Sequence, residues 1–236
     1  MKLFIFKEAS ILGVGNLEKE IIILAKSKKF YNLCIAGIDT SNGEWIRIVS
    51  DDDSISHAVK IEDAVYEDGS VSNLFDVVKI ECKGKEESYY QVENYIYDSN
   101  YYWLKVRQAS IKEILRIHPI EDKDFIFYNS QKKIPNTLLL EQREAEKYSL
   151  MLISPKNMII HVRQWPNKKD VTMSFIYNGI FYKYLSVTDI EYEQRFLSLE
   201  PGDYKLKEGT LLVLSLGDCY YKDNCHYKLI ASIIER

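Results

Sequence analysis

A β-hairpin is encoded by residues 171–187, which read Val-Thr-Met-Ser-Phe-Ile-Tyr-Asn-Gly-Ile-Phe-Tyr-Lys-Tyr-Leu-Ser-Val. Two runs rich in β-branched and aromatic residues, Val171–Tyr177 and Ile180–Val187, flank the pair Asn178-Gly179. Asn-Gly favours a two-residue type I′ turn, because both turn positions take positive φ values. The stretch therefore predicts two antiparallel strands joined by a tight turn.

Short strand patterns continue on both sides of this hairpin. In the first half, strands are predicted at Ile21–Ala25, Leu33–Asp39, Glu44–Val49, Phe75–Cys82 and Tyr89–Tyr97. In the second half, they are predicted at Leu150–Ser154, Met158–Val162, Thr210–Ser215 and Tyr227–Ile234. The alternation of strands and helices that a doubly wound parallel sheet requires is missing. The spacing favours two small β-barrels, and the pattern alone leaves OB-folds, SH3-like barrels and PUA-like barrels open.

Two helical patterns stand between the strand clusters. In Lys105–His118, apolar residues recur on one helical face, and Pro119 ends the pattern. Leu138–Tyr148 is rich in Glu, Arg and Lys, which is typical of a solvent-exposed helix. We therefore expect a domain boundary between about residues 119 and 148.

The composition is typical of a folded globular protein and excludes several other classes. The 236 residues are 46% hydrophobic and 28% charged, with 10 Gly and 5 Pro, which excludes a disordered or collagen-like chain. We expect no membrane helix and no signal peptide, because apolar runs are short and charges interrupt Met1–Glu8. The 4 Cys indicate a cytoplasmic protein without a disulfide scaffold. At a net charge of −4, any nucleic-acid site has to be a local patch.

Several segments, taken in order, resemble a known family pattern. The pattern is a hydrophobic strand, an Ala-Lys-Ser turn, a Cys-hydrophobic-Ala-Gly strand and a Trp-Ile-Arg-Pro step. The corresponding segments here are Ile21–Lys29, Leu33–Asp39, Gly43–Arg47, Phe75–Val78, Gln91–Asn94, Tyr182–Asp189, Leu214–Gly217 and Tyr227–Ala231. In them the chain resembles the dual OB-fold proteins, a bacterial family with some members linked to conflict systems.

The resemblance spans roughly Ile21 to the C-terminus, with two departures. Ile48 stands where the family has Pro, and Phe30-Tyr31-Asn32 replaces a His-Gly-Gly-like stretch. The resemblance implies two tandem OB-like barrels with a nucleic-acid or nucleotide ligand, and it implies no established reaction. We therefore expect a mainly β fold with one or two connecting helices. The expected domains are an N-terminal extension at 1–20, a first OB-like barrel with a helix at 21–120, a linker with a helix at 121–148 and a second OB-like barrel at 149–236.

Two candidate binding groups lie in the first half. Trp45 and Arg47 are two apart on a predicted strand, so they project from one face and could stack a base and bind its phosphate. The alternative is that Trp45 fills the barrel core and Arg47 pairs with an acid. Lys26 and Lys28 follow the first strand and could meet phosphates, or they are part of a solvated loop.

A third candidate group lies in the second half. His161, Arg163 and Trp165 alternate, so all three can share one strand face. Lys168 and Lys169 follow, and across residues 156–187 five basic residues face a single acid. Basic residues interleaved with aromatic ones suit a groove that binds a single strand, and a solvated hairpin over an aromatic core is the alternative. Pro166 cannot donate to a ladder, which places Trp165 near a strand end.

No motif predicts catalysis. The spacing of Cys219 and Cys225-His226 is outside that of structural zinc knuckles, and Asp51-Asp52-Asp53 is typical of a solvated loop. We predict no catalytic residue, no metal and no cofactor.

The leading hypothesis is therefore a non-enzymatic module that binds single-stranded DNA or RNA, or a nucleotide-like ligand. The alternative is a protein-interaction or sensor subunit of a bacterial defence-type system that binds a partner protein. A nucleic-acid hydrolase is the third hypothesis. A membrane partner is not expected.

Overall fold

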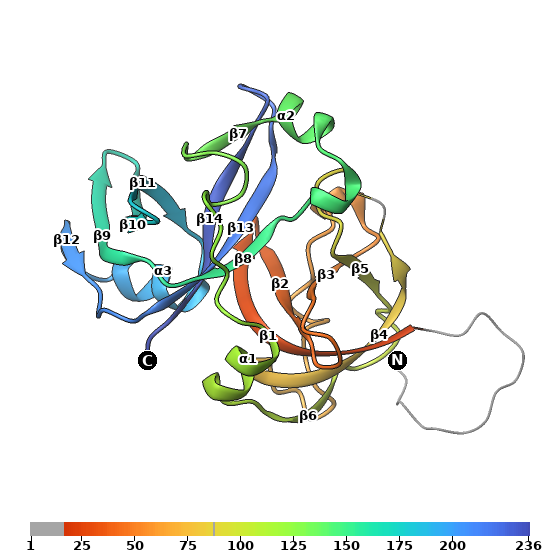
Figure 1. Ribbon diagram of the computed structural model, residues 1–236. Helices are drawn as coiled ribbons and strands as arrows, with labels where there is room; N and C mark the ends of the chain where they lie inside the picture. Colours follow the sequence, from red (N-terminus) through yellow and green to blue (C-terminus); the bar gives the residue numbers. More distant parts are fainter. Residues whose placement is uncertain (1–16, 87) are drawn as a thin grey trace, which may run out of the picture. The chain divides into compact units, whose positions relative to one another are not determined.

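The computed structural model describes residues 17–86 and 88–236, which form two compact units (Figure 1). The first unit contains the described residues up to Ser88 together with Glu93–Pro119. The second contains Tyr89–Val92 and Ile120–Arg236. No helix in the described part of the chain is both long and apolar enough to cross a bilayer.

The first unit is a closed five-stranded barrel. Its elements are β1 (Leu17–Lys29), β2 (Asn32–Asp39), β3 (Trp45–Val49), a 3₁₀ turn (Asp53–Ile55), β4 (Asp76–Lys85), β5 (Asn94–Tyr97), β6 (Leu104–Gln108) and α1 (Ile111–Ile117). β1, β2 and β3 pair in sequence, β3 pairs in parallel with β5, β5 pairs with β4, and β4 returns to β1. This circuit is a Greek-key barrel of the OB-fold kind.

The core of this barrel follows from the apolar runs of β1 and β2. Ile21, Ile22, Ile23 and Leu24 are all fully buried. Gly37 lies opposite Ile23, where β1 bulges, and a Cβ at Gly37 would stand 2.2 Å from the Ile22 carbonyl oxygen. Glycine therefore allows the close backbone approach that bends the sheet into a barrel.

The second unit has a similar order of strand pairings to the first unit and contains more elements. They are β7 (Lys133–Pro135), α2 (Asn136–Glu141), a 3₁₀ turn (Glu144–Glu146), β8 (Leu150–Ile153), β9 (Lys156–Trp165), β10 (Lys168–Tyr177), β11 (Ile180–Val187), α3 (Ile190–Leu197), β12 (Gly202–Lys205), β13 (Leu211–Tyr220) and β14 (Cys225–Ile234). Only Ser154-Pro155 separates β8 from β9, so the two act as one bent strand.

This bent strand closes the second circuit. β9 pairs with β10, β10 with β11, β11 in parallel with β14, β14 with β13, and β13 with β8. The order repeats that of the first unit, with β8–β9 in the place of β1. The expected mainly β fold is confirmed.

One short segment belongs to the second unit although it interrupts the sequence of the first. Tyr89–Val92 lies between two stretches of the first unit but belongs to the second. Within the second unit, the Tyr90 hydroxyl donates to Asp218 at 2.7 Å, and the Gln91 amide donates to the Leu216 carbonyl at 3.2 Å.

Several predicted elements differ in the structure. The predicted helix Lys105–His118 was wrong in its first part, because Lys105–Gln108 pairs with β4 as part of β6. The helix begins after Ser110, whose hydroxyl accepts the Glu113 N–H at 3.2 Å. The predicted helix Leu138–Tyr148 was too long, since α2 ends at Glu141. The elements β6, β7, β12 and α3 were not predicted.

The predicted domain boundaries remain a prediction. Residues 1–16, most of the expected N-terminal extension, lie outside the described residues.

Candidate nucleic-acid interface

The tip of the β9–β10 hairpin projects from the second barrel. Trp165 pairs with Lys168 across the two-residue turn Pro166-Asn167. β12 reaches along β9 only to Val162, and β11 reaches along β10 only to Thr172. Among the described residues, 163–170 therefore form a ribbon with neither outer edge paired. Trp165 is 52% exposed at its end.

The three predicted cations around this tip have different environments. Arg163 Nη1 donates to the Val162 and Gly202 carbonyls, and Nη2 donates to Asp203. Lys168 is exposed and pairs with Asp170 at 3.0 Å. Lys169 instead donates to the Leu197 and Leu199 carbonyls at the end of α3. Since the helix dipole favours a cation there, Lys169 has a structural role, whereas Arg163 and Lys168 remain at the surface.

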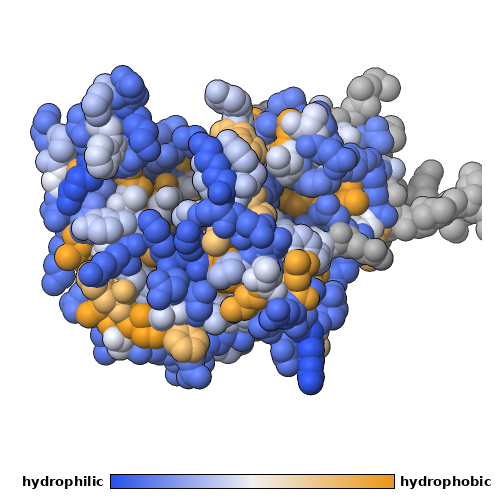
Figure 2. Space-filling model, turned by 90° about the horizontal axis from the view of Figure 1, so that it is seen from above, coloured by the Kyte–Doolittle hydropathy of each residue, from blue (hydrophilic) through white to orange (hydrophobic). Residues whose placement is uncertain are grey.

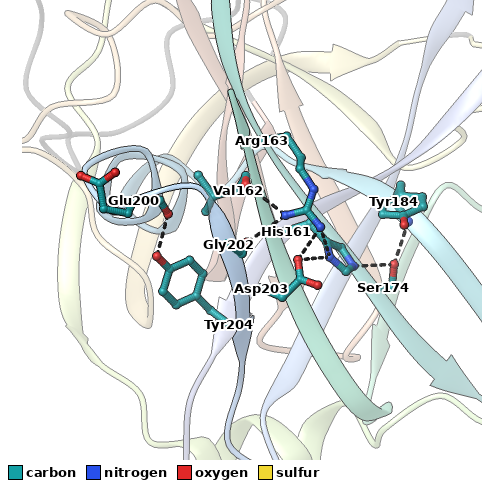
Figure 3. Close-up of polar contacts among 9 residues, drawn as sticks. All are labelled: His161, Val162, Arg163, Ser174, Tyr184, Glu200, Gly202, Asp203 and Tyr204. Carbon is teal, nitrogen blue, oxygen red and sulfur yellow. Dashed lines mark hydrogen bonds and ion pairs between the residues drawn. The ribbon is translucent and has the colours of Figure 1, made fainter. Parts of the chain in front are cut away.

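His161 lies beneath this surface in a polar network (Figure 3). Its Nδ1 is 2.9 Å from Asp203 Oδ1, and its Nε2 is 2.9 Å from Ser174 Oγ. The hydrogen bonds from His161 and Arg163 lower the pKa of Asp203 below its usual range. The imidazole is buried, so the ring is held rather than offered to a ligand.

These distances are those of a Ser-His-Asp triad, but the burial is reversed. In a hydrolase of this kind, the Asp is buried and the Ser faces the substrate. Here Asp203 is 55% exposed in its side chain, and Ser174 is 2% exposed. The Tyr184 N–H also donates to Ser174 Oγ at 3.1 Å, which occupies an acceptor site of the hydroxyl. The network therefore orients side chains and shows no accessible nucleophile.

The network places Tyr184 on the outer face of the sheet. The Tyr184 ring packs on His161 with centroids 4.8 Å apart and is 53% exposed (Figure 3). Its φ of 53° lies at a bulge between β10 and β11, an unfavourable conformation for a bulky residue. Of the other aromatics interleaved along this hairpin, Phe181 is exposed, whereas Tyr177 and Tyr182 are buried.

We call the resulting surface the hairpin face. It consists of Arg163, Trp165, Lys168, Phe181, Lys183 and Tyr184 on β9, β10 and β11. In an OB-fold, the second and third strands and the turn between the first two form the usual ligand surface. In the strand order of this unit, those elements are β10, β11 and the β9–β10 turn.

A second aromatic and basic turn joins β13 to β14. Tyr221 and Tyr220 are exposed there, and Lys222 Nζ lies 5.7 Å and 6.0 Å from their ring centroids. Both this turn and the β9–β10 turn lie at the upper end of the second unit in Figure 1. This turn was not predicted from the sequence, although two tyrosines and a lysine in a row, Tyr220-Tyr221-Lys222, were a visible signal at the end of β13.

The candidates of the first unit are mostly internal. Arg47 is buried, with Nη2 3.2 Å from Glu93 Oε1 and Nη1 3.0 Å from Cys34 Sγ. Trp45 packs edge-on against His118 with centroids 5.0 Å apart. A buried guanidinium that already has a carboxylate partner offers no phosphate contact, so we leave Arg47 and Trp45 out of the interface.

The two predicted lysines of β1 have different environments. Lys26 donates to the Ser72 carbonyl at 2.6 Å, and burial lowers its pKa. Lys28 is exposed near the end of β1.

No metal centre is evident in the described ranges, which contain no group of three or more His, Cys, Asp or Glu side chains placed to hold an ion. Asp51 pairs with Lys83, Asp52 with Lys60, and Asp53 with His57.

Residues 19–233, nearly the whole chain, match the model of one family, the dual OB-containing domain. The chain belongs to the dual OB-containing domain family. The resemblance noted in the sequence is thereby confirmed, and so is the expected OB-like fold class. No curated protein and no solved structure matched the chain. OB-fold domains commonly bind nucleic acids or other ligands.

Proposed function

We propose that this dual OB-containing domain protein binds single-stranded nucleic acid on the hairpin face, without catalysing a reaction. The observation that carries the proposal is the exposure of Trp165 and Tyr184 together with Arg163 and Lys168. Lys168 and Tyr184 lie on the second and third strands, which OB-folds use for ligands, and Trp165 flanks the turn between the first two strands. Aromatic faces stack bases of any sequence, and cations track the backbone.

The cations of the hairpin face can exchange partners. Arg163 pairs with Asp203, and Lys168 pairs with Asp170, in both cases with the cation partly exposed. Exposed ion pairs contribute only about 0–1 kcal/mol, so a phosphate can replace either carboxylate at little cost. Asp203 and Asp170 stay close to these cations and repel the phosphates of a bound strand. We therefore expect weak, salt-sensitive binding.

His161 has an indirect role in this proposal. Because its ring supports Tyr184 and shares Asp203 with Arg163, it positions one stacking residue and one cation. His161 and Lys169, two of the predicted contacts, are therefore proposed as positioning residues.

A nucleotide-like ligand is a weaker proposal. An open hollow of about 530 Å³ in the second unit is lined by Tyr128, Tyr148, Lys123 and Lys147. Glu121 and Glu146 line it as well, and carboxylates oppose a phosphate there.

A protein-interaction or sensor role in a bacterial defence-type system is a second proposal. It is supported by β6, whose five residues are all exposed, including Leu104 and Val106, and which pairs only with β4 among the described strands. An open edge strand can accept a strand of a partner. Figure 2 shows the face seen from above, away from β6, and on that face the hydrophobic residues form separate groups among hydrophilic ones, which is less typical of a large docking surface.

We also propose a cytoplasmic location. All four cysteines are free thiols, as a reducing compartment allows.

Binding is tested by fluorescence anisotropy with labelled single-stranded DNA and RNA at two salt concentrations. The parent protein is compared with Trp165→Ala and Lys168→Ala. Leu140→Ala and Lys112→Ala serve as matched controls, because both residues are exposed and lie outside the hairpin face. Absence of binding at low salt by a folded parent protein would refute the proposal.

A further inference from the structure

The first barrel has a turn at the same place in its strand order as the β9–β10 turn. Phe30-Tyr31 joins β1 to β2, with Lys29 paired to Asn32 across it. Pro166-Asn167 joins β9 to β10 in the same way, with Trp165 paired to Lys168. β1 and β8–β9 occupy equivalent positions in their circuits. Both turns therefore have two residues and connect the first two strands of a barrel.

The side chains of the β1–β2 turn are aromatic and in solvent. Tyr31 is 95% exposed, and Phe30 is 65% exposed. Phe30 also has a φ of 55°, a left-handed conformation that favours Gly or Asn over an aromatic residue. Phe127 has a similar φ, but it is buried and its packing explains its place in the core. Packing does not explain Phe30.

The turn is also flanked by basic residues. Lys28 is exposed, and Lys29 is half-buried at the end of β1. The second barrel has a related arrangement, in which the exposed Trp165 and Lys168 flank the two-residue turn. Strained backbone at an exposed site is an observation from which a functional role can be inferred.

We propose that the β1–β2 turn is a second contact for single-stranded nucleic acid, with a base stacked on Tyr31 and the backbone near Lys28 and Lys29. The proposal rests on the function proposed for the hairpin face and extends it to two contacts on one protein. A strand long enough to reach both contacts then binds more tightly than a strand that occupies only one, because the second contact forms intramolecularly.

The test uses the full chain and oligodeoxythymidylates of about 8, 16 and 32 nucleotides, which bracket the site size of one or two OB-folds. Dissociation constants are measured for the parent, Tyr31→Ala, Trp165→Ala and the control Val106→Ala, an exposed residue of the first unit away from this turn. Because Tyr31 is almost fully exposed, its removal leaves the fold intact, which a thermal melt verifies.

We expect Tyr31→Ala to weaken binding of the longest oligonucleotide by about 5-fold or more. The loss should be smaller with the shortest oligonucleotide, and Val106→Ala should bind like the parent. If Trp165→Ala weakens binding but Tyr31→Ala matches the parent at every length, the second contact is refuted and the hairpin face stands. If the parent binds no oligonucleotide, both proposals fail.

Discussion

The rings of His161 and Tyr184 pack against each other with 4.8 Å between their centroids, so a buried residue of β9 supports an exposed one of β11. Ser174 completes the support, because its Oγ lies 2.9 Å from His161 Nε2 and accepts the Tyr184 N–H at 3.1 Å. Three strands are thus joined under one aromatic side chain. The stability of this network and the stacking by Tyr184 are separable by mutation.

Ser174→Ala should destabilise the protein by about 1–3 kcal/mol, because the buried His161 Nε2 loses its hydrogen-bond partner. A urea melt measures the loss. Thr172→Ala, on the same face of β10, serves as the control. A variant as stable as the parent would show that the network contributes little.

Trp165→Ala should leave the free energy of unfolding nearly unchanged, because the indole is half in solvent at the end of a strand. It should weaken binding of a single strand by about 1–3 kcal/mol, the usual contribution of one stacked base. Melting and titration are carried out on the same preparation. A large drop in melting temperature, or an unchanged affinity, would remove Trp165 from the interface.

Lys168 and Lys169 are adjacent, but their substitution should affect different properties, binding for Lys168 and stability for Lys169. Lys168→Ala should reduce the log–log salt slope of binding by about 0.7, the value for one phosphate on a single strand. Lys169→Ala should leave that slope unchanged and lower stability, because Lys169 binds the carbonyls at the end of α3. Titrations at several salt concentrations and urea melts separate the two. Equal slopes for both variants would contradict the assignment.

Lys228 should make stability depend on pH. It is buried on β14 and donates to the Ile126 and Asn129 carbonyls, and burial lowers its pKa to about 7. Between about pH 7 and pH 10 the unfolded chain therefore binds more protons at this residue than the folded chain, so stability should rise with pH.

The measurement for Lys228 is the free energy of unfolding at several pH values across that window. Lys228→Met should remove the contribution of this residue, which reaches about 1.4 kcal/mol per pH unit. The difference between parent and variant isolates it from other titrating groups. A difference that does not change with pH would mean that Lys228 stays protonated on its carbonyl partners.

Arg47→Ala should destabilise the first unit by about 3–5 kcal/mol, because it leaves the buried Glu93 carboxylate without its ion-pair partner. Oligonucleotide affinity of the remaining folded protein should be unchanged. An affinity loss without a stability loss would return Arg47 to the interface.

The sequence predicted those elements whose conformation depends on their own residues. Asn178 and Gly179 take φ values of 47° and 76°, as the type I′ turn requires, and β10 and β11 flank them as predicted. Lys105–Gln108 was misassigned because its strand conformation comes from pairing with β4, more than twenty residues earlier in the chain. A helical pattern within the segment carries no information about that partner.

The candidate site shows the same limit. His161, Arg163 and Trp165 alternate along β9 as predicted, and Arg163 and Trp165 are at the surface. His161 is buried because Tyr184 of β11 and Asp203 of β12 cover it, and neither neighbour can be inferred from the spacing within β9. Alternation shows which residues share a face, whereas burial depends on the strands next to it.

The assignment of Tyr89–Val92 to the second unit has a consequence for dissecting the protein. A fragment from Ile120 to Arg236 would contain every strand of the second barrel but would lack the donors to Asp218 and Leu216. It would also uncover the His226 ring, on which Tyr89 and Tyr90 pack. During synthesis these four residues leave the ribosome before the barrel that receives them exists, so that barrel can complete its packing only with a piece of chain made earlier.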